Sequence, residues 1–171
     1  PEEAPMLLTV FADWLDKHGE PSAAGRARDL GRSSALGFEA VLPGPVGERN
    51  LYALHPRGRI LLRPATREGL LGQMAAVLAT GNTATVEGMD LPEGLPAKIA
   101  ARFHANPGEF FAACLVEGDV QAVRGACDSA AKLPGPIVPV HVWTGHDTGP
   151  NGAWLLEEVS TSINTTAAGG N

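Results

Sequence analysis

Apolar residues recur at helical spacing through the first part of the chain. One amphipathic set precedes Gly19 and Pro21, which end the run. This set consists of Leu7, Leu8, Val10, Phe11, Trp14 and Leu15. A second helix is predicted to begin with Ser22 as its N-cap and to continue to Leu36, although two glycines within it lower the helix propensity. We therefore predict a leading helical segment over residues 1–40.

Short apolar runs then alternate with helical patterns. The predicted strands cover residues 51–54, 59–62, 83–86, 110–116 and 136–143. The predicted helices run from 67 to 80 with Thr66 as N-cap, onward from Pro96, and from the N-cap Asp119 to about 133. Residues 42–47 and 144–152 are predicted loops, residues 55–58 a turn, and Gly81-Asn82 a left-handed C-cap.

The alternation predicts a fold class. Strands that alternate with helices, and that are themselves almost wholly apolar, are typical of a parallel sheet covered on both faces. We therefore expect a Rossmann-like, doubly wound α/β domain over residues 41–152. Pro136 and Pro139 predict that the last strand lies at an edge of the sheet or enters it irregularly, because proline donates no ladder hydrogen bond.

The last part of the chain follows a different pattern. Residues 160–171 carry no charge and only one large side chain, Ile163. Small residues allow close backbone approach, whereas a disordered tail more often carries charge and proline. We predict an extended arm over residues 153–171 that needs a partner surface. The start at Pro1 and the ending within this arm favour a piece of a longer chain.

Composition excludes several function classes. The 13 basic and 19 acidic residues give a net charge of −6, which argues against nucleic-acid or anionic-membrane binding. One Tyr, five Phe and three Trp leave few rings for stacking on bases. Cys114 and Cys127 form no CxxC pair, so we expect buried thiols in a reduced, cytoplasmic setting.

Candidate chemistry is sparse. No GxGxxG follows the first strand of the α/β domain, but Arg63 and Arg67 near a helix start are candidate phosphate ligands, with a solvated helix end as the alternative. His141 and His146 lack an evident third ligand, so no metal site is predicted. Glu157 and Glu158 face opposite sides of a strand, and no serine lies in a nucleophile elbow. We predict no catalytic residue.

Residues 55–86, and above all Gly81-Asn82-Thr83, resemble the cofactor-domain entry of the aldehyde dehydrogenase superfamily. The resemblance implies that Arg63-Pro64-Ala65-Thr66 replaces the loop that supplies the oxyanion Asn, and that Glu87 replaces the Lys that holds the adenosine ribose. A carboxylate there repels a pyrophosphate. The catalytic Cys and base segments have no counterpart, and Cys127 is interpreted as a packing residue. The cofactor positions Arg63, Thr66, Arg67 and Glu87 are therefore expected to be degenerate, with no cofactor in this segment.

Residues 159–164, followed by Gly169-Gly170, resemble the superfamily's oligomerisation arm. Together with residues 44–50, they are similar to the C-terminal domain of the proline utilization A family, whose long members oxidise proline to glutamate with FAD and NAD. This implies a non-catalytic domain whose flap covers the dehydrogenase active site and its channelling tunnel. The flap positions would be Leu155, Leu156, Val159, Ile163, Asn164, Gly169, Gly170 and Asn171.

The resemblance also implies partners. The flap would contact the aldehyde dehydrogenase domain of the same polypeptide or of a sister subunit. The resemblance implies a cytoplasmic parent and leaves open whether that parent attaches peripherally to the inner membrane. It implies no direct membrane contact by this segment. Two alternatives remain open: a modified nucleotide site at Arg63, Arg67 and Glu87, and a self-association module that acts through the arm.

Overall fold

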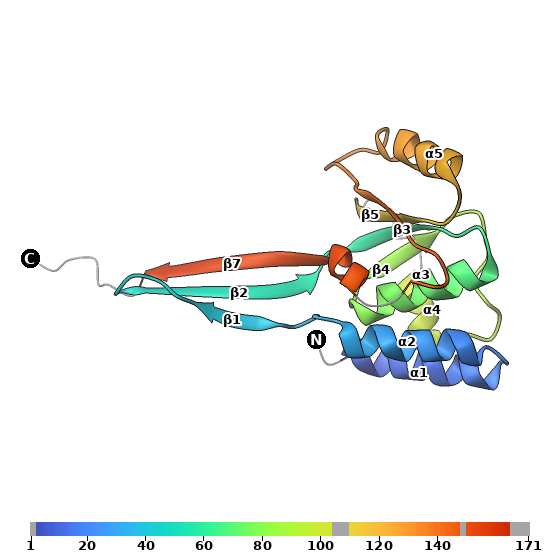
Figure 1. Cartoon of the computed structure of the whole chain (residues 1–171), viewed down its shortest axis with the longest axis horizontal. Coiled ribbons are helices and arrows are strands. Elements are labelled where there is room, and N and C mark those ends of the chain that lie inside the picture. The colour runs from blue at the N-terminus through green and yellow to red at the C-terminus, as the bar shows by residue number, and fades with distance from the viewer. Residues whose placement is uncertain (1–2, 104–109, 148–149, 165–171) are drawn as a thin grey trace, which may run out of the picture.

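The computed structural model describes residues 3–103, 110–147 and 150–164. It consists of an α/β body from which a long, three-stranded sheet extends (Figure 1). We refer to this sheet as the flap. In the described ranges, no helix is long and apolar enough to cross a bilayer.

The two leading helices are α1 (Glu3–Lys17) and α2 (Pro21–Ser33), and they pack on each other and on α3. The predicted bounds of the second helix are wrong. Pro21 begins it, because the first turn of a helix needs no N–H at that position, and Glu20 is the N-cap without a side-chain bond. The helix ends at Ser33 because Ser34 adopts extended dihedral angles, φ −66° and ψ 130°.

The body contains a four-stranded parallel sheet with the strand order β4-β3-β5-β6. Its strands are β3 (Arg59–Arg63), β4 (Thr83–Val86), β5 (Phe111–Val116) and β6 (Val140–Val142). Its helices are α3 (Arg67–Ala79), α4 (Ala97–Ala100), the 3₁₀ helix η1 (Ala101–Phe103) and α5 (Val120–Ala130). The expected edge position of β6 is confirmed, but β6 is shorter than predicted because two prolines precede it.

Both faces of this sheet are covered, as in a doubly wound fold. Ile60 and Leu62 face the core that α1, α2 and α3 complete, whereas Leu61 between them packs with Cys114 and Ala130 on the α5 side. Alternate residues of one strand thus enter separate clusters, which explains the uninterrupted apolar run. The predicted Rossmann-like α/β class is confirmed.

The flap consists of β1 (Glu39–Leu42), β2 (Glu48–Pro56) and β7 (Leu156–Asn164) in the order β1-β2-β7, all antiparallel. β1 was not predicted from the sequence, and the predicted strand at 51–54 and turn at 55–58 are wrong in extent. β2 continues to Pro56 because it pairs with β7 along all nine residues. The predicted arm therefore has a partner within the chain. The predicted domain boundaries at residues 41 and 153 would divide β1 and would separate β2 from β7, although these strands form one sheet.

Candidate functional site

The carboxyl edge of the parallel sheet brings together residues that follow or end β3, β4 and β5. The chain passes from β3 to β4 on one side and then to β5 on the other, so the winding reverses beside β3. Ligands of open α/β sheets bind outside the carboxyl ends of the strands at such a reversal. Arg63 ends β3 here, Glu87 follows β4, and Glu117 follows β5.

Glu117 occupies the N-terminus of α3. Its carboxylate accepts hydrogen bonds from the backbone N of Ala65 and of Thr66, both at 2.8 Å, and from Thr66 Oγ1 at 2.9 Å. Thr66 is the N-cap of α3, as predicted, and its Oγ1 accepts from Gly69 N at 2.9 Å. The helix dipole and free N–H groups favour an anion at this position. The chain's own carboxylate therefore lies where a phosphate group would bind.

The two arginines that the sequence offers to a phosphate are paired with carboxylates. Arg63 Nε lies 2.9 Å from Glu87 Oε2, and Arg67 Nε lies 2.9 Å from Glu20 Oε1. Arg63, Thr66 and Glu87 thus meet at one edge, whereas Arg67 points to the loop before α2. The interpretation of these positions as a degenerate cofactor site stays a prediction.

The two candidate histidine ligands do not converge. His141 stacks on Trp154 with ring centroids 4.7 Å apart, whereas His146 Nδ1 lies 3.7 Å from Glu68 Oε1. Nowhere in the described part of the chain do three His, Cys, Asp or Glu side chains gather as a metal site would require.

The cysteines differ in exposure. Cys114 is buried in β5, as expected, and burial raises the pKa of its thiol to about 11. Cys127 is exposed on α5, so the expectation of a buried packing residue is wrong there. It lies on the outer face of an amphipathic helix whose buried positions are Ala126 and Ala130.

Asn82 joins the flap to the body. It is 1% exposed, its Oδ1 accepts from Gly58 N at 2.7 Å, and its Nδ2 donates to Thr80 Oγ1 at 2.7 Å and to Leu155 O at 2.8 Å. One side chain thereby ties the end of α3, the start of β3 and the start of β7. The left-handed Gly81, φ +70°, is confirmed as predicted and sets the turn that presents Asn82.

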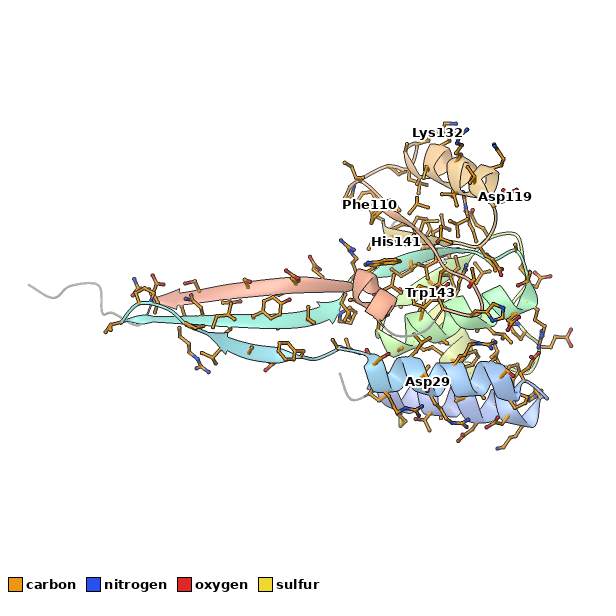
Figure 2. All side chains as sticks on the ribbon, viewed as in Figure 1. Asp29, Phe110, Asp119, Lys132, His141 and Trp143 are labelled. Atoms are coloured by element: carbon orange, nitrogen blue, oxygen red, sulfur yellow. The ribbon has the colours of Figure 1, made fainter. Side chains whose placement is uncertain are left out.

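Arg57 and His141 also contact the residues where the flap joins the body, Trp154 and Leu155. Arg57 donates to Leu155 O through its backbone N at 3.2 Å and to Trp154 O through Nη1 at 2.7 Å. Trp154 belongs to the 3₁₀ helix η2 (Pro150–Leu155), which leads into β7, and it stacks on His141 (Figure 2). Burial, and secondarily the Arg57 charge, lower the pKa of His141.

The predicted flap residues divide into two groups. Leu155 and Leu156 are 0% and 6% exposed and anchor the root of β7 in the body. Val159 and Ile163 stand on one exposed side of β7, and Asn164 pairs with Glu48 at the far end. Gly169, Gly170 and Asn171 lie outside the described residues.

Four residues of the carboxyl edge and of the junction between flap and body were not predicted from the sequence: Arg57, Asn82 as a junction residue, Glu117 and Trp154. Each acts across a large sequence separation, such as the 73 residues from Asn82 to Leu155. The one available signal was Gly81-Asn82, where an amide beside a left-handed glycine is well placed to bond neighbouring backbone.

The chain is similar to one segment of much longer proteins. Bifunctional protein PutA of Rhizobium meliloti is 46% identical over 98% of this chain, which spans 15% of that protein. Bifunctional protein PutA of Escherichia coli is 31% identical over 96% of this chain and 13% of its own length. No family model matches.

Solved structures share the fold. A Bradyrhizobium japonicum proline utilization A variant aligns with 82% of this chain and 19% of its own, with TM-score 0.56 and 21% identity. An NAD-dependent benzaldehyde dehydrogenase from Corynebacterium glutamicum aligns with 82% of this chain and 40% of its own, with TM-score 0.54 and 16% identity. Along nearly all of its length, the chain is homologous to one segment of the bifunctional PutA proteins, about 13–15% of the length of these relatives.

Proposed function

We propose that this chain is a non-catalytic domain of a longer bifunctional enzyme that oxidises proline to glutamate. The flap covers the aldehyde dehydrogenase active site and the tunnel through which the intermediate passes. Its partner is the aldehyde dehydrogenase domain of the same polypeptide or of a sister subunit. The parent carries FAD at its proline dehydrogenase site and NAD at its aldehyde dehydrogenase site.

The observation that carries this proposal is the flap itself. β1 and β2 contain no buried residue, and β7 contains one, Leu156 at its root. A sheet of this length that buries so little apolar area is poorly stabilised alone. A second protein surface that covers it supplies the missing burial.

The chain's own side chains occupy the carboxyl edge of the parallel sheet, which supports a body without catalytic function. An added phosphate at the N-terminus of α3 has to displace Glu117 and lies beside Glu87, two carboxylates that repel it. The alternative, a modified nucleotide site at Arg63, Arg67 and Glu87, requires both ion pairs to open. Titration calorimetry of the chain with NAD separates the two: binding tighter than millimolar supports the nucleotide site.

The flap role is tested in the full-length polypeptide with and without residues 153–171. We expect the truncated protein to lose coupled conversion of proline to glutamate while it retains proline oxidation at the separate flavin site. Unchanged coupled flux, together with an unchanged unfolding midpoint, would rule out the proposal.

A further inference from the structure

A hollow lies where the flap joins the body, beside the amino ends of the parallel strands, and we call it the junction hollow. Its volume of about 700 Å³ falls within the roughly 300–1,000 Å³ of small-molecule sites. The body lines it with the first residues of β3, β4 and β5, namely Arg59, Thr83 and Phe111. The flap lines it with Pro56 at the end of β2 and Glu157 near the start of β7. Both parts of the molecule therefore form the hollow together.

The body presents exposed apolar side chains to the junction hollow. Phe110 and Ile137 are 56% and 96% exposed. Ala112, Pro136 and Pro139 are further lining residues from the body. Contact with an apolar ligand group removes these surfaces from water, which is favourable. The hollow therefore suits a ligand with an apolar part.

Two side chains of opposite charge, Arg57 and Glu157, also line the hollow. His55 pairs with Glu157 across the β2–β7 ladder. One position further along, the backbone N of Arg57 donates to Leu155 O at 3.2 Å. Arg57 and Glu157 are therefore diagonal neighbours on one face, with Cβ atoms about 7–8 Å apart. Neither belongs to an ion pair among the residues that the structure describes.

Arg57 is held in place but keeps donors for a ligand. Its Nη1 donates to Trp154 O at 2.7 Å, and a guanidinium carries five N–H donors in all. Arg59, which also lines the hollow, adds a second positive charge. Its guanidinium lies 4.7 Å from the ring centroid of Phe111 and donates to Thr85 Oγ1 at 2.7 Å. The two arginines favour a carboxylate in the hollow, whereas the carboxylate of Glu157 favours a positive group.

We propose that the junction hollow binds the zwitterion of an α-amino acid that has a small apolar side chain. The ligand carboxylate lies toward Arg57, its ammonium group toward Glu157, and its side chain against Phe110 and Ile137. A simple anion is repelled by Glu157 and a simple cation by the two arginines, whereas a zwitterion pairs with both signs of charge. Because the flap and the body both line the hollow, the bound ligand contacts both and stabilises their junction.

This inference goes beyond the proposed function, which gives the segment no small-molecule ligand. L-Proline is the probe of choice, because its ring is apolar and its amine and carboxyl groups are both charged at neutral pH. That choice rests on the proposed function, since proline is the amino acid that the proposed parent oxidises. Exposed ion pairs contribute little to binding and the ligand is small, so we expect a Kd of about 1–10 mM.

The test is an NMR titration of the full 171-residue chain, labelled with ¹⁵N, with L-proline. We expect saturable shifts of the amides that line the hollow, such as Gly58 and Phe111. Glu157→Gln should raise the Kd about two- to fivefold, the factor for one exposed ion pair. The matched control is Glu158→Gln, the exposed neighbour on the opposite face of β7, which should leave the Kd unchanged. Unchanged amide shifts in α1 and α2 show that each variant is folded.

Two analogues test the charge pattern. Pyrrolidine lacks the carboxylate and N-acetyl-L-proline lacks the positive charge, so each should bind several-fold more weakly than L-proline. Equal binding of either analogue, or equal Kd values for the Glu157→Gln and Glu158→Gln variants, would overturn the zwitterion site.

The site and the proposed function can fail separately. No saturable shift at L-proline concentrations about tenfold above the expected Kd would overturn the site. A loss of coupled flux on removal of residues 153–171 would then leave the proposed function standing. Conversely, proline binding by the chain together with unchanged coupled flux in the truncated polypeptide would support the site and contradict the proposed function.

Discussion

The body and the flap use similar strand residues in opposite ways. In β3, Ile60, Leu61 and Leu62 are at most 1% exposed and enter cores on both faces of the sheet. In the flap, Leu42 and Val159 stay 42% and 37% exposed. The body is therefore stabilised by burial, whereas the flap is stabilised by strand pairing and by its anchored root. This difference is what we expect if the body is a scaffold and the flap a surface that another domain covers.

The largest effect should come from matched leucine truncations in the two parts. Leu62→Ala leaves a cavity in the fully buried core, so we expect the free energy of unfolding to fall by about 2–5 kcal/mol. Leu42→Ala in β1 should lower it by under about 1 kcal/mol, because the side chain is 42% exposed. Urea unfolding of both variants gives the comparison, and equal losses would contradict it.

The next largest effect is expected at Asn82, which joins the flap to the body. Asn82→Ala removes three hydrogen bonds and leaves the N–H of Gly58 and the carbonyl of the buried Leu155 without this partner. We expect a loss of about 2–4 kcal/mol, with faster amide exchange in β7. Asn50→Ala, a change of the same type within β2, serves as the control. A loss confined to exchange in the body would show that Asn82 does not anchor the flap.

A smaller effect is expected at the carboxyl edge. Glu117→Gln keeps the shape of the side chain but removes the negative charge at the N-terminus of α3. We expect a loss of about 1–2 kcal/mol, since hydrogen bonds to charged groups contribute more than neutral ones. Glu93→Gln at an exposed position is the control. If the two variants unfold at the same denaturant concentration, Glu117 is not the counter-charge of this helix.

The smallest effect concerns pH. Because burial and Arg57 lower the pKa of His141 in the folded state, the unfolded chain binds more protons in the interval below its ordinary pKa of about 6.5. As the pH falls from about 6.5 through the lowered pKa of folded His141, this residue therefore lowers the free energy of unfolding. Above that interval, His141 contributes nothing to the pH dependence of stability. His141→Gln should reduce the decline in unfolding free energy between pH 7.5 and 5.5. An identical decline in both proteins would exclude this residue as a cause.

Much of the body follows from the sequence because its signals are local. The apolar run of β3, the Thr66 N-cap and the left-handed Gly81 each specify structure within a few residues. The flap does not follow in this way. β2 is nine residues long because β7, about a hundred residues later, pairs with it, and a propensity limited to residues 51–54 cannot contain that information.

The candidate sites show the same division. Arg63 and Glu87 were each named as altered positions of the resemblance, but the ion pair between them was not predicted. Glu117 was missed because nothing in its neighbourhood along the chain indicates that β5 ends beside the start of α3. Residues 153–171 were predicted as an extended arm, but the pairing of β7 with β2 depends on a register that the sequence of the arm alone does not specify.

If the flap, rather than the body, is the part that another domain covers, its amides should be protected only when that domain is present. Hydrogen–deuterium exchange of the chain alone and of the full-length polypeptide measures this, with peptides from β3 and β5 as internal references. We expect amides of β2 and β7 to exchange slowly only in the full-length protein, while those of β3 and β5 are equally protected in both. Equal exchange of β2 and β7 in the two proteins would show that no other domain covers the flap.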